Sequence, residues 1–126
     1  MTEFTSPYAT TLGLTLARVD GRIVVTMAST DGTAGRPGFL HGGAISGLLD
    51  YAAWATLLEA LESDTRIKPI TIGIDFMRGG KPQDCYAAAT IVRLGRRVAN
   101  VQAFAWQDDE ARPIASADLK FIVVRE

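Results

Sequence analysis

The segment at residues 41–61, HGGAISGLLDYAAWATLLEAL, decides how the rest of the chain can fold. A histidine and two glycines open a long run that is apolar on nearly every side, which is typical of a helix surrounded by its own domain. Asp50 lies near the middle of this run. An ionised carboxylate in apolar surroundings is costly unless a partner, water or a ligand meets it, so Asp50 is the first candidate functional residue.

The residues one helical turn from Asp50 are small, which leaves room beside its carboxylate. Ser46, Gly47 and Ala53 lie three or four positions from Asp50 and therefore on the same helix face. A glycine within a helix costs roughly 1 kcal/mol relative to alanine, so Gly47 indicates a close approach by a packing element or a ligand.

The expected N-terminus of the helix, at Gly42 and Gly43, is a candidate site for an anion or a carbonyl group. The first backbone N–H groups of a helix have no internal acceptor, and the helix dipole is positive there. Glycine lets a ligand approach this backbone closely, so the N–H groups can hold an oxyanion or polarise a carbonyl. His41, beside them, could donate a hydrogen bond to a ligand or orient the loop.

His41 and Asp50 are nine residues apart, which corresponds to roughly 13 Å along a helix. Both cannot touch the same reacting carbonyl within one subunit. If they act together, two helices must run antiparallel across a two-fold axis, each supplying one half of each site. The segment therefore predicts a dimer as well as a catalytic acid.

Two strands are expected before the helix. They occupy residues 11–19 and 22–28, after a polar, proline-broken lead-in at residues 1–9 with at most a short helical turn. Asp20-Gly21 between them is a strong signal for a two-residue type I′ hairpin, because Asp and Gly both tolerate positive φ.

Four further strands are expected after the helix. An irregular loop at residues 29–40, rich in Gly and Pro, leads into the helix. Beyond the helix the apolar residues recur with a period of two, which predicts strands at residues 69–77, 85–94, 98–106 and 114–124. The first of these is expected to be half-buried through its alternating apolar residues, Ile70, Ile72, Ile74 and Phe76.

The short connections between these strands imply antiparallel neighbours, because a parallel pair would need a long crossover. A single helix is available to cover the sheet. The predicted architecture is one α+β domain spanning residues 1–126, with an antiparallel sheet curled around one long central helix. One face of the sheet would remain open, so oligomerisation is expected.

Composition narrows the class of protein. At 126 residues, 48% apolar and with a formal charge of −1, the chain resembles an ordinary globular domain without the basic excess of a nucleic-acid-binding protein. Asp50 and Glu59 interrupt its longest apolar stretch, so no membrane span is predicted.

The N-terminal residues have no basic leader and apolar block, so no signal peptide is expected. The single cysteine, Cys85, suits a reducing compartment, and we expect a cytoplasmic protein. The single histidine cannot build a multi-histidine metal site, and we expect no metal.

The run His41-Gly42-Gly43, followed after six residues by Asp50, resembles the hotdog-fold acyl-CoA thioesterases of the PaaI and 4-hydroxybenzoyl-CoA thioesterase type. The resemblance continues through ITIGIDFMRGG, the GRR turn and the closing ASADLKFIV strand, and so covers nearly the whole chain. It implies a hotdog fold and hydrolysis of an acyl-CoA thioester to free acid and coenzyme A.

The resemblance also implies residue roles. The backbone N–H of Gly42, with its neighbour Gly43, would polarise the thioester carbonyl, supported by His41. Asp50 of the facing subunit would act as nucleophile or as general base for water. The remaining candidates bind substrate: the resemblance implies that basic residues hold the coenzyme A phosphates, here Arg78, Lys81, Arg96 and Arg97. Independently of the resemblance, aromatic residues including Phe39 and Trp54 could line an acyl pocket, although most of the aromatic residues are expected to be core.

We expect a homo-oligomer, a dimer at least and a dimer of dimers (a homotetramer) as the expected form, with no cofactor beyond the coenzyme A of the substrate. Two positions depart from the resemblance. Many relatives carry Asn or Gln where this chain has Gly35, and some carry Ser or Thr where it has Arg78.

Two other functions remain open from the sequence. One is a non-catalytic acyl-CoA or acyl-carrier binding protein on the same fold. The other is a hotdog hydratase or dehydratase, which needs an Asp and a His at one site; the position of His41 beside the glycines disfavours this reading.

Overall fold

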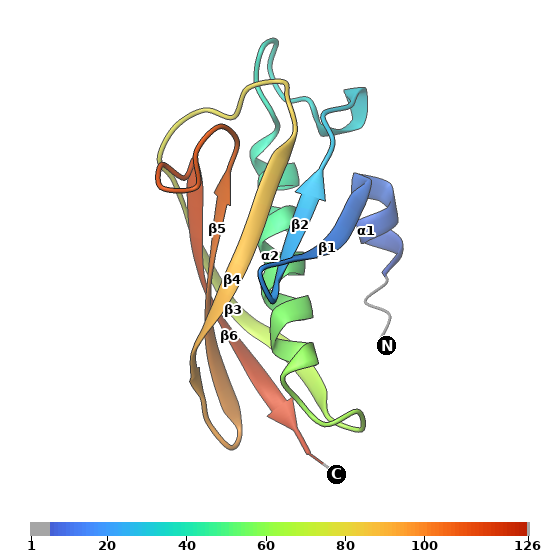
Figure 1. The fold of residues 1–126 in the computed structure, drawn as a ribbon, viewed down its shortest axis with the longest axis vertical. Coiled ribbons are helices and arrows are strands. Elements are labelled where there is room, and N and C mark those ends of the chain that lie inside the picture. The colour runs from blue at the N-terminus through green and yellow to red at the C-terminus, as the bar shows by residue number, and fades with distance from the viewer. Residues whose placement is uncertain (1–5, 126) are drawn as a thin grey trace.

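The computed structural model describes residues 6–125. Its elements, in chain order, are α1 (Pro7–Leu12), β1 (Leu14–Val19), β2 (Arg22–Met27), the short 3-10 helix η1 (Asp31–Thr33), α2 (Gly42–Glu59), β3 (Arg66–Phe76), β4 (Cys85–Leu94), β5 (Val98–Trp106) and β6 (Ala115–Val124). The strands form one sheet in the order β1-β2-β4-β5-β6-β3. Every neighbouring pair is antiparallel. Figure 1 shows this sheet curled around α2, which confirms the predicted α+β architecture.

The β1–β2 hairpin confirms the predicted turn. Asp20 and Gly21 have φ angles of 52° and 80°, as a type I′ turn requires, and Val19 pairs with Arg22 across it. The predicted strand at residues 11–19 began too early, because residues 7–12 form α1 instead.

Local capping explains why α1 is a helix. The Ser6 side chain accepts a hydrogen bond from the Ala9 N–H at 3.1 Å, and Pro7 stands in the first turn, where its missing N–H costs nothing. Gly13, with φ of 68°, ends the helix in the left-handed conformation. Residues 1–5 of the predicted lead-in lie outside the described residues.

Helix α2 packs closely against the inner face of the sheet. It contributes the buried residues Ile45, Leu48, Leu49 and Leu57. The facing strands contribute small side chains, namely Ala87, Ala103, Ala105, Ala115 and Ala117, all buried. Such small residues allow the helix axis to approach the sheet, which is how a single helix buries so much of itself.

The face of α2 that carries Asp50 is less buried than its composition predicts. His41, Gly43 and Asp50 are exposed, and only the opposite face meets the sheet. The expectation that α2 is surrounded on nearly every side is therefore wrong for the single chain.

Gly47 marks where α1 crosses this open face. A Cβ atom at Gly47 would lie 2.6 Å from Leu12 Cδ1 and 2.9 Å from Tyr8 Cε2. The close approach that Gly47 indicates is therefore the packing of α1. The cost of a glycine within α2 is offset by the close contact with α1 that the absence of a side chain at Gly47 permits.

Strand β3 differs most from its prediction. Ile70, Ile72 and Phe76 are 48%, 44% and 54% exposed, so β3 is not half-buried in the single chain. In the described chain β3 pairs with β6 alone, at one edge of the sheet, while α2 lies mainly over β2, β4 and β5. A register shift between Pro69 and Thr71 also breaks the simple alternation that the sequence suggests.

The described residues contain no helix long and apolar enough to cross a membrane.

Replacing Gly47 with valine should destabilise the fold, because the new side chain must displace Leu12 and Tyr8 from α2. Overpacking of this kind costs about 1–3 kcal/mol. Urea unfolding of the variant measures the loss. Gly73→Val is the control, because a Cβ at Gly73 meets no atom within 4 Å. Equal stability of the two variants would contradict the role assigned to α1.

Candidate active site

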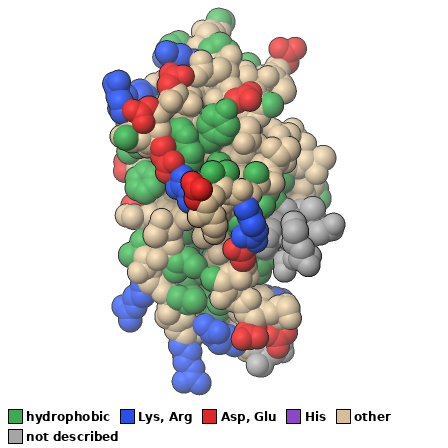
Figure 2. Space-filling view, viewed as in Figure 1, with side chains coloured by type: hydrophobic (Ala, Val, Ile, Leu, Met, Phe, Trp, Pro, Cys, Tyr) green, Lys and Arg blue, Asp and Glu red, His purple; other side chains and the backbone are tan. Residues whose placement is uncertain are grey.

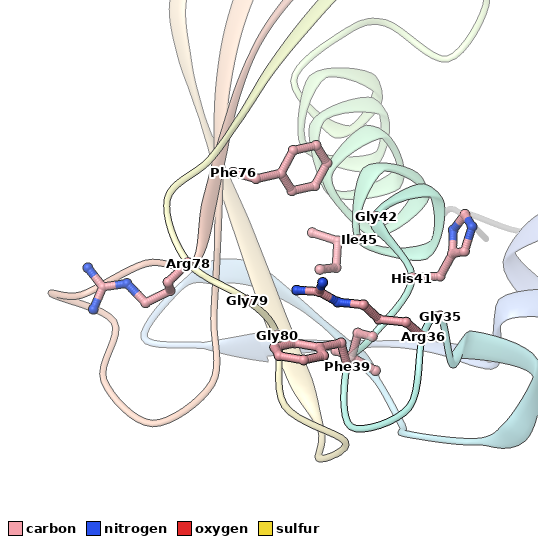
Figure 3. A pocket seen from close by; sticks show the side chains of 11 residues that line it. Gly35, Arg36, Phe39, His41, Gly42, Ile45, Phe76, Arg78, Gly79 and Gly80 are labelled. Carbon is pink, nitrogen blue, oxygen red and sulfur yellow. The ribbon is translucent and has the colours of Figure 1, made fainter.

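A pocket of about 520 Å³ opens at the N-terminus of α2. Its walls come from the loop before α2, the first turn of α2 and the segment that follows β3 (Figure 3). The predicted site residues Phe39, His41, Gly42 and Arg78 line it. The structure therefore brings the predicted carbonyl site, one predicted acyl contact and one predicted basic residue to the same place.

His41 is the N-cap of α2. Its Nδ1 accepts a hydrogen bond from the Gly43 N–H at 2.9 Å. In the neutral imidazole this leaves the proton on Nε2, which can donate outward. A Cβ at Gly43 would lie 2.9 Å from the same Nδ1, so a side chain at Gly43 would displace the imidazole.

Among the first backbone N–H groups of α2, that of Gly42 is the one left without an acceptor in the described chain. The N–H groups of Ala44 and Ile45 donate to the His41 carbonyl at 3.0 and 3.2 Å, and that of Gly43 donates to the His41 side chain. No acceptor within residues 6–125 takes the Gly42 N–H. The expectation that both glycine N–H groups face a substrate carbonyl is corrected accordingly: in the single chain the Gly43 N–H serves the cap.

Asp50 lies in a different, smaller pocket of about 190 Å³. Ser6, Tyr51, Trp54, Pro69 and Phe121 line it with Asp50. Trp54, a predicted substrate contact, is therefore beside Asp50 and not beside Gly42. The helical rise of about 1.5 Å per residue keeps Asp50 roughly 13 Å from His41, so one chain does not bring them together.

The surroundings of Asp50 affect its ionisation. Its side chain is exposed to solvent in the single chain, yet the surrounding protein atoms displace enough water to raise the pKa of its carboxyl above the usual aspartate value. Proton acceptors in enzymes often have pKa values raised in this way.

The predicted basic residues fall into two separate groups. Arg78 lies between the Gly42 pocket and a neighbouring pocket that Lys81 lines, with Lys81 Nζ 3.9 Å from Asp108 Oδ2. Arg96 and Arg97 follow the other end of β4, roughly 30 Å away for a strand of 10 residues. Figure 1 places the turn between β4 and β5 at the lower end of the molecule, and Figure 2 shows Lys and Arg side chains there together with Asp and Glu.

Arg36 is a pocket residue that the sequence interpretation missed. It lines the Gly42 pocket, and its Cζ lies 4.3 Å from the centre of the Phe39 ring. Figure 3 shows its guanidinium directed into the pocket, whereas the side chain of Arg78 points away. The available signal was a basic residue five positions before His41, within a loop that was interpreted only as irregular.

Gly35, the residue before Arg36, lies too close to the backbone of His41 to carry a side chain without a shift. A Cβ at Gly35 would lie 3.0 Å from the His41 Cα and 3.3 Å from the His41 N, both backbone atoms. An Asn or Gln at this position would therefore require the loop to move.

Other polar residues contribute little to either pocket. Asp75 is exposed on β3 and pairs in register with Ser116. Burial raises the pKa of the Cys85 thiol to about 12, which makes it a poor nucleophile. No group of three or more potential metal ligands occurs among residues 6–125.

The cap can be tested apart from any contact with substrate. His41→Ala should destabilise the protein by about 0.5–2 kcal/mol, whereas His41→Asn should stay close to the wild type because asparagine is a good N-cap. Urea unfolding measures both. If the two variants lose stability equally, the His41–Gly43 bond is not what stabilises this end of α2.

Comparison with known proteins identifies the family. The family model described as the Thioesterase superfamily matches residues 37–114 of this chain, which include Gly42 and Asp50. A search of curated proteins found no match.

Solved structures share the fold. A Chromobacterium violaceum protein is 32% identical, with 94% of this chain and 84% of that chain covered and a TM-score of 0.79. A Bacillus halodurans protein solved with CoA is 21% identical, with 99% and 83% covered and a TM-score of 0.88. A phenylacetic acid degradation-related protein of Ralstonia eutropha is 24% identical, with 94% and 91% covered and a TM-score of 0.83. Because the family match spans more than half of the chain, the protein belongs to the thioesterase superfamily and has its hotdog fold.

Proposed function

We propose that the protein hydrolyses acyl-CoA thioesters to a free acid and coenzyme A, at sites shared by two copies of the chain. The observation that carries this proposal is the Gly42 N–H, which has no acceptor among residues 6–125 and lies at a helix N-terminus in a pocket of about 520 Å³. Thioester hydrolysis needs such a donor, because negative charge develops on the carbonyl oxygen when the carbon is attacked.

The reaction adds water across the C–S bond. The oxygen nucleophile attacks the carbonyl carbon, the oxyanion forms beside the Gly42 N–H, and the C–S bond breaks as the oxyanion collapses. The coenzyme A thiolate leaves and takes up a proton, while the acyl group leaves as a carboxylic acid. The positive end of the α2 dipole favours the oxyanion over the neutral ground state.

Asp50 supplies the nucleophile in one of two ways. As a general base it would accept a proton from the attacking water. As a nucleophile it would form an acyl–aspartyl anhydride, which water then cleaves. The raised pKa of its carboxyl suits the first role.

The site requires a second chain. Asp50 is on the exposed face of α2, and the apolar residues Ile72 and Phe76 of β3 are uncovered. A second copy with its α2 antiparallel to the first would cover these residues and place its Asp50 near Gly42. We therefore propose a homodimer with two equivalent sites.

A dimer of dimers would use the outer face of the sheet. Val98, Phe104 and Ile122 are exposed there, on the opposite side from α2. A homotetramer through this face remains part of the proposal.

The substrate would lie across both pockets. Phe39 at the Gly42 pocket and Trp54 of the facing copy, beside its Asp50, would contact the acyl group. Arg78 and Lys81 would bind the coenzyme A phosphates, and an antiparallel dimer turns the partner's Arg96 and Arg97 toward this end. The Bacillus halodurans protein of the same fold, solved with CoA, supports this ligand class. We propose no other cofactor, and a cytoplasmic location, which suits the free Cys85.

The hydratase alternative is less well supported, because His41 Nδ1 is engaged by Gly43 and His41 is far from Asp50 in the chain. Binding without turnover is the other outcome to be tested.

A thiol-release assay with short, long and aromatic acyl-CoAs tests the proposal. The wild type should release coenzyme A, and Asp50→Asn should lower kcat by about 10²- to 10⁴-fold, the usual contribution of a general base. Full activity of Asp50→Asn would remove Asp50 from the mechanism. Tight binding without thiol release would indicate a non-catalytic binding protein.

Mixed dimers test the shared site. Gly42→Pro removes the N–H but suits the first helical position, and the extended backbone of His41 (φ −72°, ψ 134°) accepts a following proline. Each variant alone should be inactive. Refolding Gly42→Pro with Asp50→Asn in equal amounts makes half of the dimers mixed, each with one intact site, and should restore about a quarter of wild-type activity. No recovery would mean that Gly42 and Asp50 act within one chain.

The pH dependence follows from the raised pKa of Asp50. Only the ionised carboxylate can act, so kcat/KM should rise by about ten-fold per pH unit until the pH passes a pKa above the usual aspartate range. The folded chain holds this proton to higher pH than the unfolded chain, so ionisation lowers stability as the pH rises through the folded-state pKa. Asp50→Asn should therefore be at least as stable as the wild type at neutral pH. A kcat/KM profile that is flat on the acid side would contradict this role.

A further inference from the structure

We propose that Arg36 selects acyl groups that carry a carboxylate at their far end, so that the preferred substrates are dicarboxylic acyl-CoA thioesters. The inference rests on the proposed function and adds to it the chemical class of the acyl group.

Arg36 places a positive charge in the pocket that Gly42 lines. Arg36 and Gly42 line the same pocket, and the guanidinium points into it beneath Ile45 (Figure 3). Stacking on Phe39, at 4.3 Å from the ring centre, holds the guanidinium against one wall. A stacked arginine is oriented in advance, so less freedom is lost when it binds a ligand.

The charge of Arg36 has no acidic partner among residues 6–125. No aspartate or glutamate of residues 6–125 lines the pocket. Elsewhere among the described residues, Arg18 pairs with Glu59, Arg22 with Glu110 and Lys81 with Asp108. The pocket therefore contains a cation that substrate can neutralise.

The apolar lining of the pocket favours a ligand that neutralises the guanidinium over one that does not. Phe39, Leu40, Ile45 and Phe76 line the pocket with apolar atoms, and Arg36 itself is exposed to solvent in the single chain. A neutral acyl group would remove water from the guanidinium and give nothing in return. A carboxylate would replace that water with two parallel charge-assisted hydrogen bonds from the guanidinium fork.

The phosphates of coenzyme A are the other anions that could bind Arg36, but they lie too far from the thioester group to reach Arg36. They are separated from the sulphur by the whole pantetheine arm, whereas Arg36 shares with Gly42 a pocket of about 520 Å³, the size of a small-ligand site. Arg78, whose side chain points away from this pocket, is better placed for phosphates (Figure 3). Arg36 is thus left for the acyl end.

The test compares glutaryl-CoA with pentanoyl-CoA, which have the same number of carbon atoms but differ in the terminal carboxylate. The wild type should have a kcat/KM at least about ten-fold higher for glutaryl-CoA, as expected for a hydrogen bond to a charged group. Arg36→Met should lower this ratio by about the same factor. Arg36→Lys, which keeps the charge but not the fork, should give an intermediate ratio.

Arg78→Met is the matched control: it removes a guanidinium that points away from the pocket, so it should weaken both substrates alike through the coenzyme A phosphates and leave the ratio unchanged. No preference of the wild type for glutaryl-CoA, or an equal loss for both substrates in Arg36→Met, would overturn the inference. Equal loss would mean that Arg36 supports the site, for example by pairing with an acid of the second copy. Hydrolysis of pentanoyl-CoA without hydrolysis of glutaryl-CoA would overturn the role of Arg36 and leave the proposed thioesterase function in place. No thiol release from any acyl-CoA would overturn both the role of Arg36 and the proposed function.

Discussion

The close packing of α2 against a sheet face lined with alanine is the constraint on which the rest of the structure depends. Leu48, Leu49 and Leu57 are completely buried in this contact, so the rotation of α2 about its axis is fixed. The opposite face of the helix must then point away from the sheet, and Asp50 lies on that face. A different rotation would move Asp50 into the core, where an unpaired carboxylate would be costly.

The length of the helix fixes the distance between the two catalytic candidates. A helix does not shorten, so the roughly 13 Å between the His41 and Asp50 positions is set by the number of residues between them. The two pockets of the single chain reflect this separation: Gly42 lines one and Asp50 lines the other. The uncovered apolar residues of β3 lie where a second copy would have to pack for the proposed site to form.

Much of the fold could be predicted from the sequence, because its signals are local. The Asp20-Gly21 turn, the period-two strands and the apolar helix each depend on near neighbours in the chain, and short connections fix the antiparallel order. Helix α1 was missed at its C-terminal half, although Ser6-Pro7 and Gly13 are ordinary capping residues. The burial of β3 was wrong for the single chain because alternation shows which residues share a face, and not whether anything covers that face.

The candidate site was less predictable, because it depends on atoms rather than on patterns. The spacing of the glycines and Asp50 predicted that they do not meet within one chain, and in the single chain they line separate pockets; the sharing of each site by two chains stays a prediction. It could not show that His41 Nδ1 would occupy the Gly43 N–H, since that requires the rotamer of the imidazole. Nor could it single out Arg36 from the other arginines, because only the folded loop shows which guanidinium points into the pocket.

The contact of α1 with Gly47 connects a short, locally capped helix to the central helix that carries Asp50. Ser6, at the start of α1, forms part of the wall around Asp50, while Leu12, at its end, rests on the helix that carries Asp50. The sheet contributes nothing to how α1 is capped. The shape of the Asp50 pocket can therefore be altered through α1 alone during evolution, with the sheet and its long-range pairings left as they are.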